Sequence, residues 1–358
     1  MNMTSELAVF AGKRALAVIR ERGLRSEDIR VIAGAAGGPK WLVLGHLDRL
    51  LFSSWIKPRR EPLFLLGASI GAWRFAALSQ KAPIQALERF EDAYIHQTYN
   101  QRPSAAEVSR ESARILSEYL REASIPEILD HPFLRLNVMT VRCRPPVDAD
   151  RKARLLVGLG MAAMANGIHR NLIGLFFERC LFSHPGTRPP FWSGNHVSLQ
   201  RVGLTERNIR PALMASGAIP LVMEGITDIP GALPGMYRDG GIVDYHLDVP
   251  FLEGDAGLVL YPHYMPRIIP GWFDKQMKWR KPSQENMAGV VMISPSEEFI
   301  HRLPLRKIPD RNDFWLFEKR DAERIAYWKT VVSESRRLAD AFAEATATGR
   351  IREMVRPL

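Results

Sequence analysis

Short apolar runs followed by glycines and then by helical periodicity mark the first part of the chain. Residues 63–66 form a wholly apolar run, which is typical of a strand buried on both faces, and residues 30–33 form a second short strand. Ala72, Phe75 and Ala76 then recur at helical spacing after the later run. This order predicts two successive strand–helix units with parallel strands, and therefore the α/β fold class.

The remaining pattern predicts further helices and strands. Apolar positions at helical spacing predict helices over residues 5–22, 84–94, 104–122, 151–183, 205–216 and 321–346, with Thr205 as the N-cap of the fifth. Short or alternating apolar runs predict strands over residues 134–139, 197–202, 258–261 and 290–293. We expect one domain over residues 1–358. It would have a motif-bearing core at about 29–255, an apolar insertion at about 151–195, and a C-terminal extension at about 256–358 that ends in the long helix.

The apolar run at 63–66 leads into a Gly-x-Ser-x-Gly pattern formed by Gly67, Ser69 and Gly71. In a strand–turn–helix of this kind the serine hydroxyl projects from a sharp turn at a helix N-terminus, where the dipole favours developing negative charge. The flanking glycines fit a turn that is too tight for a Cβ atom. The pattern predicts a nucleophile elbow at Ser69, with a glycine-containing loop as the alternative interpretation.

A serine nucleophile needs a base and hydrogen-bond donors for the oxyanion. The glycine loop at 34–38, followed by Pro39 at a helix start, offers bare backbone N–H groups. Phosphate-loop and dinucleotide patterns do not fit the residues or the glycine spacing here. The base candidate is Asp239, which precedes Gly240 and Gly241, although Asp-Gly is also a hairpin-turn signal.

This set of motifs resembles the patatin-like phospholipases. The glycine loop, Gly-x-Ser-x-Gly and Asp-Gly-Gly occur in the family's order, and residues 215–220 (Ala-Ser-Gly-Ala-Ile-Pro) resemble its Ala-Ser-x-Ala-x-Pro segment. The resemblance covers residues 30–250, whereas the last hundred residues carry no matching motif.

The resemblance implies a three-layer α/β/α sandwich with a mostly parallel central sheet, and hydrolysis of lipid acyl esters through an acyl-enzyme. Ser69 would be the nucleophile and Asp239 the general base of a Ser-Asp dyad, without a metal or cofactor. The resemblance further implies an oxyanion hole of backbone N–H groups and a set of supporting residues. These are Ala36, Gly37 and Gly38 for the oxyanion hole, and Lys40, Gly67, Gly71, Gly240 and Gly241 as support.

Departures from the family pattern leave alternatives open. Ala36 replaces a glycine, and Trp41 is a bulky residue expected to narrow the acyl pocket. The Asp-Gly-Gly segment is followed by an apparent insertion that holds Asp244 and His246. A catalytically weak lipid-binding protein, an acyltransferase, or a triad completed by His246 or His263 are the alternatives.

The net charge of +10 is spread over basic stretches at 57–60, 142–154, 275–281 and 302–307. Such a surface suits anionic lipid headgroups or nucleic acid, but no nucleic-acid-binding motif is present, so we expect no nucleic-acid partner. The apolar segment 151–183 is either core and pocket wall, or a lid or membrane-docking surface flanked by Arg151, Lys152, Arg154 and Arg170.

The chain has two cysteines, Cys143 and Cys180, which we expect to be free thiols in a reducing compartment. The N-terminus has no secretory pattern, and no apolar stretch reaches the length of about 20 residues that a span needs. We expect a cytoplasmic protein that acts on a lipid or other acyl ester, and peripheral contact with a membrane stays open as an alternative. The oligomeric state stays open.

Overall fold

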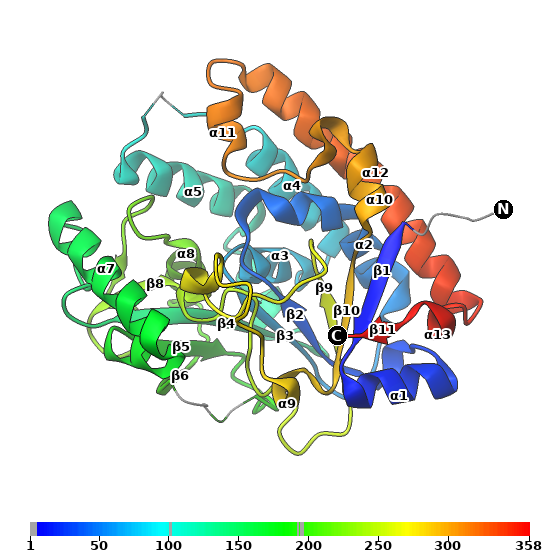
Figure 1. Ribbon diagram of the computed structural model, residues 1–358. Coiled ribbons are helices and arrows are strands. Elements are labelled where there is room, and N and C mark those ends of the chain that lie inside the picture. Colours follow the sequence, from blue (N-terminus) through cyan, green and yellow to red (C-terminus); the bar gives the residue numbers. More distant parts are fainter. Residues whose placement is uncertain (1–5, 100–101, 192, 194–196) are drawn as a thin grey trace.

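The protein is built on one large, mostly parallel β-sheet (Figure 1). The computed structural model describes residues 6–99, 102–191, 193 and 197–358. Within these residues eleven strands pair in the order β11-β1-β10-β9-β2-β3-β4-β5-β6, with β8 alongside β4 and β7 alongside β8. The strands are β1 (Leu7–Ala11), β2 (Ile29–Gly34), β3 (Leu63–Ala68), β4 (Leu134–Cys143), β5 (Phe177–Ser183), β6 (Leu199–Gly203), β7 (Ile226–Thr227), β8 (Met236–Asp239), β9 (Leu258–Pro262), β10 (Val290–Pro295) and β11 (Arg356–Pro357).

The centre of the sheet is parallel and fully enclosed. Strands β10, β9, β2, β3 and β4 run parallel to one another, and every residue of β3 and of β9 is buried. Burial on both faces explains why these strands read as continuous apolar runs and not as an alternating pattern. Antiparallel pairing joins β1 to β10 at one side, and β5 and β8 to β4 at the other.

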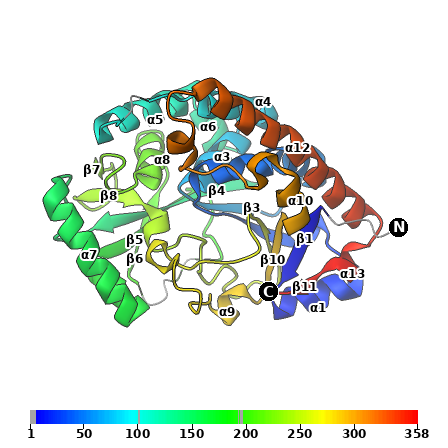
Figure 2. The same cartoon turned by 45° about the horizontal axis from the view of Figure 1, so that its top comes forward.

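Helices enclose the sheet in an arrangement compatible with three layers. In both views α3, α4 and α12 lie together on one side of the sheet, whereas α1 and α13 lie beside β1 and β11 (Figures 1 and 2). The α-helices are α1 (Lys13–Arg22), α2 (Gly45–Leu50), α3 (Ile70–Leu78), α4 (Pro83–Ile95), α5 (Ala105–Tyr119), α6 (Ser124–Leu129), α7 (Lys152–Ile168), α8 (Ile209–Gly217), α9 (Gln284–Met287), α10 (Glu297–Arg302), α11 (Asp313–Leu316), α12 (Asp321–Ala347) and α13 (Ile351–Met354). The predicted α/β class is confirmed at this level.

Three helix predictions were wrong in part: long-range strand pairing overrides helical periodicity in two of them, and the third helix begins later along the chain than predicted. Residues 7–11, predicted as the start of a helix, form β1 between β10 and β11, with Leu7, Val9 and Ala11 buried. Within the predicted helix 151–183, residues 177–183 form β5, which pairs with β4 and β6. The helix predicted from Thr205 begins at Ile209 after Asn208. The Asn208 side chain accepts a hydrogen bond from Thr205 N–H at 2.8 Å.

The segment called the C-terminal extension contributes to the central sheet. Strand β9 pairs with β2, and β10 pairs with β9, so strand β9 from this segment lies directly beside the motif-bearing strand β2. Helix α12, predicted over 321–346, is present and packs along α2. The end of the predicted insertion 151–195 lies partly outside the described residues. Among the residues that are described, the helices are all too short or too polar to cross a bilayer.

Candidate active site

Ser69 stands at a strained turn between β3 and α3. Its backbone angles are φ 55° and ψ −130°, a conformation that a residue with a side chain rarely adopts. A Cβ at Gly67 would lie 2.4 Å from Ala72 N, and one at Gly71 would lie 2.1 Å from Gly34 O. Both positions therefore require glycine, which accounts physically for the Gly-x-Ser-x-Gly pattern.

The C-terminal end of α8 and the residue after it hold the turn in place. Ser69 N–H donates a hydrogen bond of 2.8 Å to Ser216 Oγ, and Ser216 Oγ donates one of 2.7 Å to the carbonyl of Met139. Ala218, two residues further on, accepts the N–H of Asp239 at 3.1 Å. Sequence reasoning quoted Ser216 only as part of a motif. In the structure its buried hydroxyl ties the elbow to β4.

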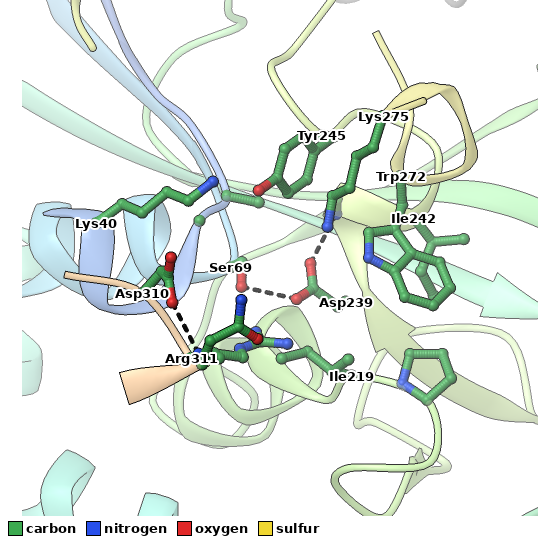
Figure 3. A pocket seen from close by; sticks show the side chains of 15 residues that line it. Lys40, Ser69, Ile219, Asp239, Ile242, Tyr245, Trp272, Lys275, Asp310 and Arg311 are labelled. Atoms are coloured by element: carbon green, nitrogen blue, oxygen red, sulfur yellow. Dashed lines mark hydrogen bonds between the residues drawn. The ribbon is translucent and has the colours of Figure 1, made fainter. Parts of the chain in front are cut away.

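Ser69 and Asp239 meet as a hydrogen-bonded pair. Ser69 Oγ donates to Asp239 Oδ2 at 2.7 Å, and Gly241 N–H donates to Asp239 Oδ1 at 2.7 Å (Figure 3). Asp239 ends β8, and a 3₁₀ turn at Gly240–Ile242 follows in place of a hairpin. A Cβ at Gly240 would lie 2.4 Å from Met139 O, and one at Gly241 would lie 2.7 Å from Ala36 Cβ. The two glycines thus let Asp239 approach both β4 and the glycine loop closely.

The environment of Asp239 raises the pKa of its carboxyl group above the ordinary value. Burial is the main cause, and hydrogen bonds from Ser69 and Gly241 together with the charges of Arg311 and Lys275 act in the opposite direction. A carboxylate that binds a proton more readily is a better general base for a serine hydroxyl.

The glycine loop lies beside this pair, between β2 and a 3₁₀ helix at Gly38–Leu44. Ala36 N–H donates to Tyr245 O at 3.1 Å, so it is already engaged and is not a free donor for an oxyanion. Gly37 and Gly38 stand at the start of the 3₁₀ helix, where the first N–H groups have no partner within the helix. The oxyanion donors that this geometry supports are therefore Gly37 and Gly38, without Ala36.

Tyr264 and His246 brace the glycine loop. Tyr264 Oη donates to Ala36 O at 2.6 Å and lies 2.7 Å from His246 Nε2. His246 Nδ1 accepts the N–H of Ile269 at 2.9 Å, so both ring nitrogens of this buried residue are occupied. His263 Nδ1 interacts with Met265, 2.7 Å from its carbonyl. The hydrogen-bonded partner of Ser69 is Asp239, and the alternative of a triad through His246 is not supported.

Trp41 and Asp244, which the sequence analysis singled out, contribute to the packing of the fold and not to the site itself. Trp41, expected to narrow the acyl pocket, is buried and stacks on Phe90 with ring centroids 4.7 Å apart. It lies among core aromatics and does not line either cavity beside Ser69. Asp244, in the apparent insertion, forms a buried bidentate pair with Arg179 at 2.6 and 2.8 Å, which anchors the segment after Asp-Gly-Gly to β5.

Two cavities meet at Ser69. The smaller, of about 200 Å³, is lined by Ser69, Asp239, Gly37 and polar residues that include Lys40, Tyr245 and Lys275 (Figure 3). The larger, of about 460 Å³, is lined mostly by apolar groups such as Trp73, Ile115, Met223, Phe314 and Phe317. Ser69, Ile219 and Arg311 line both. An ester bound at Ser69 would therefore adjoin both the smaller, polar cavity and the larger, apolar cavity.

Comparison with models of known protein families finds no match, and comparison with curated proteins finds no relative. The case for this site therefore depends on its geometry: a serine at a strained elbow, a hydrogen-bonded carboxylate and adjacent helix-start amides. Among the described residues, no group of three His, Cys, Asp or Glu side chains is placed to hold a metal ion.

Proposed function

We propose that the protein is a serine acyl hydrolase that cleaves acyl esters of lipids through a Ser69–Asp239 dyad. The observation that carries the proposal is the 2.7 Å hydrogen bond from Ser69 Oγ to Asp239 Oδ2 at a turn with φ 55°. The α/β sheet and the motif order support membership of the patatin-like class, which is part of the proposal.

The residues suit a two-step acyl transfer. Ser69 Oγ attacks the ester carbonyl carbon while its proton passes to Asp239 Oδ2, and the N–H groups of Gly37 and Gly38 stabilise the oxyanion. Collapse of this intermediate breaks the bond to the alcohol oxygen, which takes the proton from Asp239. Water then loses a proton to Asp239 and attacks the acyl-enzyme, and collapse returns the proton to Ser69 as the fatty acid leaves.

The larger cavity supports an acyl chain as the substrate group. Trp73, Ile115 and Phe317 belong to its apolar lining, and burial of each methylene contributes about 0.8 kcal/mol. Trp41 stacks on Phe90 and is not among the residues that line this cavity, which argues against the alternative of a catalytically weak lipid-binding protein. Acyl transfer to an alcohol in place of water is the remaining alternative, since the same acyl-enzyme serves both.

Labelling with a fluorophosphonate probe tests the proposal. The wild-type protein should be labelled, and Ser69→Ala should abolish labelling. Ser79→Ala, at the opposite end of α3 and with its hydroxyl bonded to Phe75 O, is the matched control and should leave labelling intact. A wild-type protein that resists the probe, or Ser69→Ala protein that is still labelled, would contradict the dyad. Product analysis with added alcohol separates hydrolysis from acyl transfer.

A peripheral contact with an anionic lipid surface through α7 belongs to the same proposal. Val157, Met164 and Ile168 are 63%, 66% and 80% exposed, and the exposed cations Arg151, Lys152 and Arg154 lie at the start of this helix. Apolar side chains beside cations are the combination that binds an interface containing anionic lipid. Helix α7 lies beside β5 and β6, with its outer side unpacked (Figure 2).

Co-sedimentation with vesicles that contain phosphatidylglycerol tests this contact. The double variant Val157→Ser, Met164→Ser should bind about tenfold or more weakly, because two exposed apolar groups are lost. Leu305→Ser, which removes a side chain of similar exposure (53%) far from α7, should bind normally. Unchanged binding of the double variant would reject the role of α7.

A further inference from the structure

Three cations converge on the smaller cavity from segments far apart in the sequence. Lys40 comes from the 3₁₀ helix that follows the glycine loop, Lys275 from the loop after β9, and Arg311 from the segment before α11 (Figure 3). Lys40 Nζ lies 5.0 Å from the centre of the Tyr264 ring, and Lys275 Nζ lies 4.2 Å from that of Tyr245. Lys275 and Arg311 belong to the part of the chain that carries no recognisable motif.

The nearby carboxylates are engaged with other groups. Asp310 pairs with Lys307 at 3.1 Å, and Asp274 pairs with Arg170 at 2.7 Å. Asp239 is then the remaining carboxylate that lines the smaller cavity, and it accepts the Ser69 hydroxyl. Within the described residues the cavity therefore brings three cations together with Asp239, a single carboxylate that is not already paired with a cation outside the cavity.

The positive charge in the cavity contributes to two pKa shifts, those of Lys275 and Tyr245. The pKa of Lys275 is lowered, mainly by burial and further by the charges of Arg311 and Lys40. Burial raises the pKa of Tyr245, but the charges of Lys40, Lys275 and Arg311, together with a hydrogen bond to Tyr264, lower this pKa below the ordinary value. An anion in the cavity would relieve the repulsion among the cations.

Buried aspartates hold the two loops that carry Lys275 and Arg311. Asp274 accepts hydrogen bonds from Asn166 Nδ2 and Arg170 at 2.7 Å each, and from Gly271 N–H at 2.9 Å. Asp313, next but one to Arg311, accepts hydrogen bonds from Trp328 Nε1 at 2.8 Å and Lys307 Nζ at 2.7 Å. Loops fixed in this way place their cations before any ligand binds, which reduces the entropic cost of binding.

Arg311 also lies directly against the candidate oxyanion loop. Its Nε would be 3.2 Å from a Cβ built on Gly38, whose φ is +57°. Because Arg311 and Ser69 line both cavities, the guanidinium stands where the polar and apolar compartments join.

We propose that Lys275 and Arg311, with Lys40, form an anion subsite that selects esters whose alcohol portion carries a phosphate or carboxylate group. This inference rests on the proposed hydrolysis at Ser69. The acyl chain occupies the larger cavity, the ester lies at Ser69, and the anionic group of the alcohol occupies the smaller cavity. The subsite makes the protein selective for anionic over neutral esters of the same chain length.

The test uses three ligands with one dodecanoyl chain and different alcohols: neutral monododecanoylglycerol, its 3-phosphate, and the dodecanoyl ester of glyceric acid. Binding is measured by calorimetry, below the micellar concentration, to Ser69→Ala protein, which leaves the esters intact. At least one anionic ligand should bind about tenfold or more tightly than the neutral one, since hydrogen bonds to charged groups correspond to about 10- to 100-fold in affinity.

Lys275→Gln and Arg311→Gln, each in the Ser69→Ala protein, should remove the preference for the anionic ligands over the neutral ligand, measured as the ratio of the two affinities within each variant. Lys275→Arg and Arg311→Lys should retain most of the preference for the anionic ligands, because both substitutions keep the positive charge. Lys278→Gln, an exposed lysine three residues from Lys275, is the control and should have no effect. If only the phosphate ligand binds more tightly than the neutral ligand, the subsite is specific for phosphate. If both anionic ligands bind more tightly by the same factor, it is a general anion subsite.

Equal affinity for neutral and anionic ligands, or a preference that survives both glutamine substitutions, would overturn the inference. The measurement needs no turnover, so its failure is separate from the failure of the proposed function. If the wild-type protein is not labelled by fluorophosphonate but the anionic ligands still bind more tightly, the dyad is refuted and the anion subsite is supported.

Discussion

Substitution of Gly71 by alanine should move the nucleophile Ser69 away from the glycine loop that carries the candidate oxyanion donors. A Cβ at this position would lie 2.1 Å from Gly34 O and 2.3 Å from Gly34 C. Carbon–oxygen contacts ordinarily begin at about 3.3 Å, so α3 and the end of β2 would have to move apart by about 1.2 Å. Gly34 leads into the glycine loop, and Gly71 follows Ser69 by two residues, so the movement displaces the oxyanion donors from the nucleophile.

The expected effects differ for stability and reactivity. Overpacking typically costs about 1–3 kcal/mol, partly offset by up to about 1 kcal/mol that alanine gains over glycine in a helix. Misplacement of reacting groups by about 1 Å reduces rates about 100-fold. Gly71→Ala should therefore fold with a modestly lower melting temperature and react with fluorophosphonate about 100 times more slowly.

Gly160→Ala provides the matched control. Gly160 lies in α7, and a Cβ there meets nothing within 4 Å. This variant should be as stable as the wild type or more stable, by up to about 1 kcal/mol, and should be labelled at the wild-type rate. A folded Gly71→Ala protein with an unchanged labelling rate would refute the argument that backbone contact between Gly34 and Gly71 aligns the site.

Three other predictions concern the charges of the site and of the elbow helix. Asp239→Asn should slow labelling about 10²- to 10⁴-fold. Because burial raises the pKa of this carboxyl group, the variant should melt at the wild-type temperature or above, and a lower melting temperature would contradict the reasoning. Activity requires the Asp239 carboxylate and should be lost as pH falls through its raised pKa, above the ordinary aspartate range. Lys275→Gln should move this acidic limb of the pH–rate profile to higher pH, and a shift to lower pH would contradict the assignment. Arg74→Met should destabilise the fold by about 3–5 kcal/mol in denaturant unfolding, because it leaves Asp48, bonded to Arg74 at 2.6 and 2.8 Å, buried without its partner. A double variant with Asp48→Leu should recover part of the loss, and equal destabilisation in the double variant would argue against this cause.

Local signals were sufficient to predict the elements that carry the candidate dyad. The apolar run of β3, the glycines around Ser69 and the helical spacing after it describe one strand–turn–helix, because tight backbone geometry restricts these positions to particular residues. Asp239 was predicted from its two following glycines, which the approach to β4 and Ala36 requires.

The residues that sequence reasoning missed act through contacts between distant segments. Ser216 is 147 residues from Ser69, and Tyr264 is 228 residues from Ala36, yet each holds its partner by a hydrogen bond. A serine or tyrosine that braces a backbone has no local pattern, because its neighbours in sequence do not constrain its partner. The engagement of Ala36 N–H by Tyr245 O, which removes one predicted oxyanion donor, likewise has no sequence signal.

The sequence by itself determined the α/β class, the strand–turn–helix at Ser69 and the candidate partner Asp239, because periodicity and glycine spacing reflect local backbone limits. Only the tertiary structure decided that residues 7–11 and 177–183 are strands, since pairing with β10 and with β4 outweighs their helical spacing. It also decided that Trp41 belongs to the core and that Lys275 and Arg311 join Lys40 at one cavity. Burial and charge convergence depend on which distant segments meet, and that is a property of the folded chain.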